Sequence, residues 1–201
     1  MQTFSKDHFS NNIPRWERLI KPRLEKKNKL NILVVGCHDG RAPFWLLKNV
    51  LTHKDSRIYC IDRFSPDVHK RFKNNMKEFG DTIQDIKVDK FMREGLNSIK
   101  HDVQFDMIFL DGMHAQEVLE VMVMTFPMLK AQGLLVVDDN TNSKEHLPNC
   151  PKVAIDAFMY IYSPFIKALD ISWQAVMLKR SRPLKIKGCK SEYYHEDLDK
   201  I

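Results

Sequence analysis

Short apolar runs that end in polar residues or glycine recur along this chain. The clearest of them occupy residues 31–36, 57–61, 105–110 and 134–137. Segments with helical spacing of apolar residues separate the runs, so the pattern predicts β-strands that lie parallel in one sheet. The carboxyl ends of parallel strands share an edge, where α/β proteins bind their ligands. The sequence therefore predicts that residues far apart in the chain meet at one crevice.

The whole pattern predicts a single α/β domain in which helices cover both faces of a mostly parallel, seven-stranded sheet. Strands are expected at residues 30–35, 57–61, 83–88, 105–110 and 134–137, with two more between 166 and 179. Helices are expected at 13–27, 43–51, 66–80, 92–99, 115–130 and 152–161. Ser65 and Pro66 are typical of an N-cap and a first helical position. Residues 131–133 are expected to form a turn, and 142–151 an exposed loop.

Composition narrows the class of protein. The 201 residues are 43% hydrophobic and 29% charged, which is typical of one soluble globular domain. No apolar stretch approaches the ~20 residues that span a bilayer, and residues 1–7 lack the layout of a secretion signal. A cytoplasmic protein without a membrane segment is therefore expected. The cysteines form no Cys-x-x-Cys pair and are expected to be free thiols; they are Cys37, Cys60, Cys150 and Cys189.

The net charge of +6 is concentrated in residues 21–29 and 179–187. Such clusters permit attraction to polyanions. No aromatic residues alternate with them as stacking platforms for a nucleic acid would require. A solvated surface beside the core is the favoured interpretation.

The first chemical signal is a loop between a strand and a helix, in which Gly36 and Gly40 flank Cys37, His38 and Asp39. Glycines permit a sharp turn and the close approach of a ligand. The amides at the helix N-terminus can meet an anionic group such as a carboxylate.

Asp62 ends the following strand, where an acidic residue commonly accepts hydrogen bonds from ribose hydroxyls. A turn or capping aspartate is the alternative for Asp62.

A second group of polar residues follows two later strands. Asp111, Asp139 and Asn140 offer hard oxygen ligands that suit Mg²⁺. Asp138 is expected to point the other way, because successive residues at a strand end alternate in direction. The alternative for Asp139 and Asn140 is an Asx turn. His114 begins the next helix, where an imidazole suits removal of a hydroxyl proton, with capping or a surface position as its alternative.

Taken together, these motifs resemble the class I S-adenosylmethionine-dependent methyltransferases over residues 11–179. Within that class the chain is most similar to small-molecule O-methyltransferases of the catechol and macrocin type. Residues 105–114, 127–133 and 137–140 carry most of the resemblance, and residues 12–16 and 151–156 resemble segments of one uncharacterised branch. The resemblance implies a Rossmann-like methyltransferase domain at 30–180, preceded by a helical segment at 1–29 and followed by a charged tail at 181–201.

The same resemblance implies roles for individual residues. The methionine part of S-adenosylmethionine would lie at residues 36–40, next to Asp111, with its ribose on Asp62. The adenine would lie near Arg63 and the turn formed by Asp89 and Lys90. A divalent ion would bind Asp111, Asp139 and Asn140. His114 stands where catechol-type enzymes place a lysine base and macrocin-type enzymes often have histidine, so catalysis would fall to His114 and Asp111.

Two residues depart from the family pattern. Val34 replaces an acid that usually helps to hold the cofactor's amino group, and Ala42 replaces a serine that helps to bind its carboxylate. Interactions of this kind are worth ~1.5–3 kcal/mol each, so affinity would fall by a factor on the order of a hundred. Either other groups compensate, with Asp39 and His38 as candidates, or activity has been lost.

The leading hypothesis is a cytoplasmic O-methyltransferase for a small polar acceptor, such as a sugar or a catechol-like compound. One alternative is an inactive relative that keeps the fold as a binding module. Another is a methyltransferase for RNA or a glycan, motivated by the positive charge. Trp16 and the apolar face of the first helix suit a homodimer as well as a lid, and the acceptor itself is not encoded in any readable motif.

Overall fold

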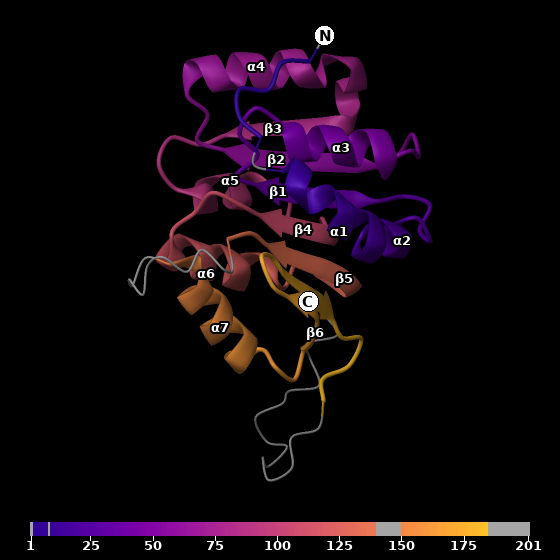
Figure 1. Cartoon of the computed structure of the whole chain (residues 1–201), viewed down its shortest axis with the longest axis vertical. Helices are drawn as coiled ribbons and strands as arrows, with labels where there is room; N and C mark the ends of the chain where they lie inside the picture. Colours follow the sequence, from indigo (N-terminus) through magenta and orange to yellow (C-terminus); the bar gives the residue numbers. More distant parts are fainter. Residues whose placement is uncertain (1, 8, 140–149, 185–201) are drawn as a thin grey trace.

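The computed structural model describes residues 2–7, 9–139 and 150–184, and it confirms the predicted α/β fold. A seven-stranded sheet has the order β3-β2-β1-β4-β5-β7-β6 (Figure 1). The strands β1 to β5 run parallel, and β7 is antiparallel to both of its neighbours. Their bounds are β1 (Asn31–Val35), β2 (Arg57–Asp62), β3 (Ile83–Lys87), β4 (Phe105–Leu110), β5 (Leu129–Val137), β6 (Ile166–Ile171) and β7 (Ala175–Lys179).

Helices cover both faces of the sheet, because β1 and β4 are apolar on both sides. One apolar cluster joins the sheet to α1 (Ile13–Leu19), α2 (Lys21–Leu24), α3 (Arg41–Asn49) and α4 (Pro66–Met76). The other joins it to α5 (Met92–Ser98), α6 (Ala115–Thr125) and α7 (Pro151–Ile161). Short 3₁₀ segments, η1 (Ser10–Asn12) and η2 (Lys77–Thr82), precede α1 and follow α4.

The strand order creates one topological switch point. From β1 the chain moves outward through β2 to β3, and β4 then pairs with the opposite side of β1. The connections that leave β1 and β4 therefore diverge to opposite sides of the sheet. A crevice forms at such a point, outside the carboxyl ends of the strands, and it is where open α/β sheets bind ligands.

Several element boundaries differ from the prediction, and proline accounts for two of the differences. The expected helix at 13–27 is interrupted at Ile20 and resumes as α2, with Pro22 in its first turn. The expected helix at 115–130 ends at Thr125: Phe126 still has helical backbone angles, but Pro127 has no N–H to continue the hydrogen bonds of the helix. Ser65 does occupy the N-cap position of α4 ahead of Pro66, although its side chain makes no capping hydrogen bond.

The predicted turn at 131–133 lies inside β5 instead. The pairing of β4 with β5 shifts between Phe105 and Met107, and Gln132 has a φ of 60°, so the chain bulges there without leaving the strand. The expected loop at 142–151 falls outside the described residues except for Cys150 and Pro151, and Pro151 begins α7. In the described part of the chain, no helix combines the length and apolar character needed to cross a membrane.

Candidate functional site

The loop after β1 turns at the switch point, and glycine is required at its first position. Gly36 has a φ of 82°, and its N–H donates to the carbonyl of Ile61 (2.8 Å). A Cβ atom at Gly36 would overlap the carbonyl oxygen of Asp111 and lie 2.8 Å from its carbonyl carbon. The missing side chain therefore allows the ends of β1 and β4 to approach each other.

A cavity of about 50 Å³ opens beside this contact. Its walls come from the N-terminal segment, the loop after β1, the start of α3 and the end of β4. The lining residues are Lys6, Phe9, Gly36, Cys37, His38, Asp39, Arg41, Ala42 and Asp111. Five of the residues predicted to bind the cofactor are thus brought together, whereas Gly40 stands at the N-cap of α3 outside the lining.

Asp111 is, with Asp39, one of the two acids among the described residues that line the cavity. Burial raises its pKa to about 7, and the charges of Asp138, Asp139 and Asp62 add to the effect. These acids come from the ends of β2, β4 and β5, so the predicted convergence at one edge of the sheet is present. A cation placed among them would relieve their mutual repulsion.

Asp62 is already engaged with the loop. One carboxylate oxygen accepts the N–H of His38 (2.8 Å), and the other accepts the N–H of Phe64 (2.9 Å). This is the turn-stabilising role that the sequence left open as an alternative. Each carboxylate oxygen has two lone pairs, so Asp62 keeps the capacity to accept further hydrogen bonds.

Asp138 lies on the same side as Asp111, contrary to the expectation from strand alternation. Leu110 pairs with Val137, and the N–H of Asp138 donates to the carbonyl of Leu110 (2.9 Å). This register places residues 111 and 138 side by side on one face. After burial, the charge of Asp138 is the largest cause of the raised pKa of Asp111, ahead of that of Asp139.

The carboxylate of Asp138 has partners of its own. It accepts the N–H of Asp139 (3.0 Å). Burial raises its pKa to about 6, although that hydrogen bond and the charge of Arg15 act in the opposite direction.

The predicted metal site at Asp111, Asp139 and Asn140 stays a prediction, because Asn140 lies outside the described residues. Among those described, no group of three or more His, Cys, Asp or Glu side chains is arranged to hold a metal ion. The residues present therefore do not by themselves supply a ligand set for Mg²⁺.

The remaining predicted residues lie around the site rather than in the cavity wall. His114 occupies the N-cap position of α6 with an exposed side chain that makes no capping hydrogen bond. Arg63 forms an ion pair with Glu117 of α6 (3.3 Å). Asp89 and Lys90 are exposed in the turn after β3, and the Lys90 ammonium lies 4.9 Å from the centre of the Phe91 ring.

The loop cysteine, Cys37, is buried. Burial, reinforced by the neighbouring Cys60, raises the pKa of the Cys37 thiol well above its ordinary value. Its Sγ donates to the carbonyl of Ile61 (3.7 Å). Cys37 therefore forms part of the cavity wall, and its burial disfavours the thiolate that a nucleophile requires.

Asp39 fastens the N-terminal segment to the loop. One of its carboxylate oxygens accepts both the N–H (2.6 Å) and the hydroxyl (2.8 Å) of Ser5. Burial alone would raise the pKa of Asp39, but these hydrogen bonds and the nearby His38 ring hold it below its ordinary value. Only one oxygen of Asp39 accepts from Ser5, so the suggestion that Asp39 replaces the acid missing at Val34 stays a prediction.

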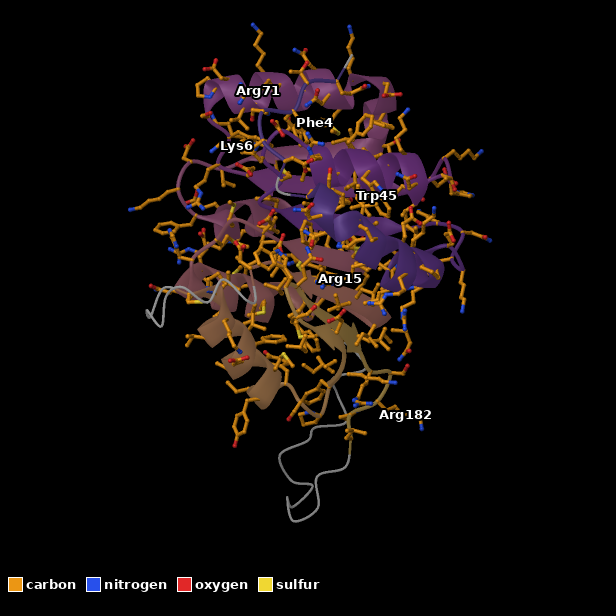
Figure 2. The ribbon with its side chains drawn as sticks, viewed as in Figure 1. Phe4, Lys6, Arg15, Trp45, Arg71 and Arg182 are labelled. Carbon is orange, nitrogen blue, oxygen red and sulfur yellow. The ribbon has the colours of Figure 1, made fainter. Side chains whose placement is uncertain are left out.

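We call residues 2–7 of the N-terminal segment the strap. Contacts with α3 and α4 also hold it in place. Asn75 accepts the N–H of Thr3 (2.9 Å) and donates to the carbonyls of Thr3 (3.0 Å) and Asp39 (2.9 Å). The Phe4 ring packs edge-on against Phe44. In Figure 1 the indigo strap begins beside α4 and descends toward α1, and Figure 2 labels Phe4 and Lys6 on it.

Sequence reasoning missed Lys6 and Phe9 as lining residues. No local pattern marks them, because their place depends on partners more than thirty positions away in sequence, such as Asp39 for Ser5. The two departures from the family pattern also have structural consequences. Val34 is fully buried in the apolar cluster beneath α3, and Ala42 lines the cavity without a hydroxyl.

One protein-family model matches this chain. Residues 33–140, more than half of the chain, match a family model described as a methyltransferase domain. A search of curated protein sequences found no match.

Solved structures share the fold at low sequence identity. The O-methyltransferase TomG of Streptomyces achromogenes, solved with SAM, is 14% identical, with a TM-score of 0.67 over 87% of this chain and 82% of its own. An O-methyltransferase from Bacillus cereus, solved with SAH, is 14% identical, with a TM-score of 0.68 over 88% and 84%. The N-methyltransferase NodS of Bradyrhizobium japonicum is 16% identical, with a TM-score of 0.59 over 87% and 99%. The shared fold thus accommodates transfer to oxygen and to nitrogen.

Proposed function

This chain belongs to the methyltransferase-domain family, and on that premise we propose that it transfers the methyl group of S-adenosylmethionine to a hydroxyl of a small polar acceptor. The observation that carries the proposal is the cavity at the switch point, where the Gly36 loop meets Asp111. The amino-acid end of the cofactor would enter there. Asp62 would accept hydrogen bonds from the ribose, and the adenine would lie toward Arg63 and residues 89–90.

In the proposed reaction the protein has two tasks: it aligns the reacting atoms and removes the proton of the acceptor hydroxyl. The acceptor oxygen forms a bond to the methyl carbon while the bond from that carbon to sulfur breaks, and the electron pair of the broken bond stays on sulfur. Holding the reacting atoms in line contributes through proximity and orientation. His114, exposed at the same edge of the sheet, would take the hydroxyl proton. Participation of a divalent ion remains a prediction, and neither the alignment nor the proton transfer depends on it.

Calorimetric titration of the full chain with S-adenosylmethionine and S-adenosylhomocysteine, with and without Mg²⁺, tests the cofactor. We expect one site for each ligand. Absence of binding at millimolar ligand would end the proposal.

Transfer is then tested with isotope-labelled S-adenosylmethionine and a panel of sugars and catechols. Changing His114→Ala is expected to lower turnover by about a hundredfold, the usual scale of general-base catalysis, and to leave the affinity for S-adenosylhomocysteine unchanged.

A second candidate function is a binding module without catalysis, and one observation favours it. The cavity of about 50 Å³ is far smaller than the ~300–1,000 Å³ of typical ligand sites. A nucleoside cofactor would therefore have to extend out of the cavity along Asp62 or displace the strap. A correctly folded chain that binds neither cofactor form would support this second candidate.

Transfer to RNA or to an anionic glycan receives less support, because lysines of both basic clusters form ion pairs or hydrogen bonds within the protein. Lys27 pairs with Asp106 (2.9 Å), and Lys21 pairs with Glu17 (3.2 Å). The ammonium of Lys179 donates to the carbonyls of Phe126 and Leu129. We place the protein in the cytoplasm, in keeping with free thiols at Cys37 and Cys60.

A further inference from the structure

We infer that Lys6 binds the carboxylate of the cofactor's amino-acid end, a role that no motif of the sequence assigns. The inference rests on the proposed function and concerns the same cavity. It identifies a cation that can bind this carboxylate in place of the serine hydroxyl, which Ala42 does not supply.

Lys6 is a cavity-lining cation that no described residue engages, whereas Arg41 is partly engaged and keeps a buried Nε without a partner in the described part of the chain. The guanidinium of Arg41 pairs with Asp7 (3.3 Å), approaches the hydroxyl of Ser10 (3.4 Å) and lies over the Phe4 ring. The His38 ring lies 3.4 Å from the carboxylate of Asp39. Within the described part of the chain, the Lys6 ammonium has no hydrogen-bond or ion-pair partner.

The position of Lys6 is fixed by the residue before it. Ser5 donates twice to Asp39, and Asp39 itself belongs to the loop that forms the cavity wall. The clamp between Thr3 and Asn75 holds the strap on α4. Lys6, labelled in Figure 2, therefore lines the cavity although the residue is exposed.

Two backbone N–H groups of the loop are already engaged. The N–H of His38 donates to Asp62, and the N–H of Gly40 donates to the carbonyl of Cys37 (2.9 Å). Ala42 has no hydroxyl. With Lys6 on one wall and Asp111 on another, the cavity presents a cation and an acid, which complements the carboxylate and the ammonium of an amino acid. A charge-assisted hydrogen bond from a lysine is stronger than one from a neutral hydroxyl.

The test compares two ligands that differ in the amino-acid end. S-adenosylhomocysteine carries the carboxylate, and 5′-methylthioadenosine keeps the nucleoside and the sulfur but lacks the amino acid. Calorimetry on the full chain measures both dissociation constants for the natural protein, Lys6→Ala, Lys6→Arg and Lys54→Ala. Lys54 is an exposed lysine in the loop before β2, so its replacement removes the same charge at a distant place.

We expect Lys6→Ala to weaken S-adenosylhomocysteine binding by about tenfold to a hundredfold, the loss typical of one charged hydrogen bond. Binding of 5′-methylthioadenosine should stay within about twofold, a negligible change on that scale. Lys6→Arg should restore most of the loss, and Lys54→Ala should change neither constant. Equal effects of Lys6→Ala on both ligands, or none on either, would overturn the role of Lys6 and leave the proposed function intact. If the natural protein binds neither ligand, the proposed function and this inference both fail.

Discussion

At the scale of single residues, the site depends on the absence of a Cβ atom at Gly36. Gly36 combines a left-handed backbone with contact against the carbonyl of Asp111, whereas Gly112 has a similar φ of 67° and open space around its Cα. Each glycine would be strained by a side chain, but only Gly36 would also clash with neighbouring backbone. Comparing substitutions at the two glycines therefore distinguishes the cost of backbone strain from the cost of overpacking.

We expect Gly112→Ala to lower the free energy of unfolding by about 1–2 kcal/mol, the strain of one left-handed residue. Gly36→Ala should lower it by at least ~3 kcal/mol, because strain adds to overpacking at the junction of β1 and β4. Urea unfolding followed by circular dichroism measures both. Equal losses in the two variants would mean that β1 and β4 can separate at little cost.

At the scale of elements, Asn75, a buried side chain of α4, is one of the groups that hold the strap. Asn75 makes three hydrogen bonds that hold Thr3 and the carbonyl of Asp39, while Asn74 beside it is exposed. Changing Asn75→Ala should release the strap locally, and hydrogen exchange at the Ser5 amide should speed up by about tenfold or more, equivalent to ~1.4 kcal/mol. Asn74→Ala is the control and should leave exchange unchanged. Identical exchange in all three proteins would show that Asp39 holds the strap unaided.

Asp106 of β4 connects three elements at the opposite end of the sheet from the cavity. Its carboxylate accepts from Lys27 (2.9 Å), from Lys130 of β5 (2.7 Å) and from the N–H of Asn31 in β1 (3.0 Å). Burial alone would raise the pKa of Asp106, but these hydrogen bonds and the lysine charges hold it below its ordinary value. Folding therefore favours the ionised carboxylate.

This lowered pKa gives the stability of the protein a predictable pH dependence. The ionised Asp106 contributes to the free energy of unfolding. This contribution is complete above the unfolded-state pKa of ~3.9 and is lost as the pH falls through the lower folded-state pKa. Asp106→Asn should lower the free energy of unfolding at pH 7 by about 2 kcal/mol, and the difference from the natural protein should shrink below about pH 4. Urea unfolding at a series of pH values checks this. A difference that persists unchanged at pH 3 would contradict the assignment.

The elements themselves were predictable because their signals are local. The runs at 31–35 and 105–110 are buried on both faces, and an uninterrupted apolar sequence is what such strands require. The boundary at Thr125 was missed although Pro127 marks it, because the apolar spacing continues beyond the helix. The strap was not predictable, since its hydrogen bonds join Ser5 to Asp39 and Thr3 to Asn75.

The site was predictable only where chain order determines geometry. Gly36, Asp62 and Asp111 follow directly from strand ends, and the sheet brings them together. The position of Asp138 required the register of β5 against β4, because moving by one residue reverses the face to which a side chain points. Lys6 required the path of the strap, and nothing in its own neighbourhood indicates that path.

At the scale of the whole molecule, Trp16 connects the two ends of the described chain across the centre of the sheet. The indole is fully buried and packs edge-on against Phe109 of β4, with ring centres 5.0 Å apart. Its N–H donates to the side-chain oxygen of Gln174 (2.8 Å), in the turn between β6 and β7 and 158 positions away. The first helix, the central strand and the last hairpin therefore meet at one side chain, and they should unfold together.

Replacing Trp16→Phe tests this connection, with Trp173→Phe as its control in the same turn as Gln174. Phenylalanine keeps an aromatic ring at position 16 but leaves the buried Gln174 oxygen without its donor, so the free energy of unfolding should fall by about 2–4 kcal/mol through the missing hydrogen bond and the smaller ring. Trp173 is 52% exposed, and its replacement should change stability by less than ~0.5 kcal/mol. Urea unfolding measures both variants, and hydrogen exchange in α1 and β7 shows whether the two elements loosen together. If α1 loosens while β7 keeps its protection, the ends of the chain are stabilised independently.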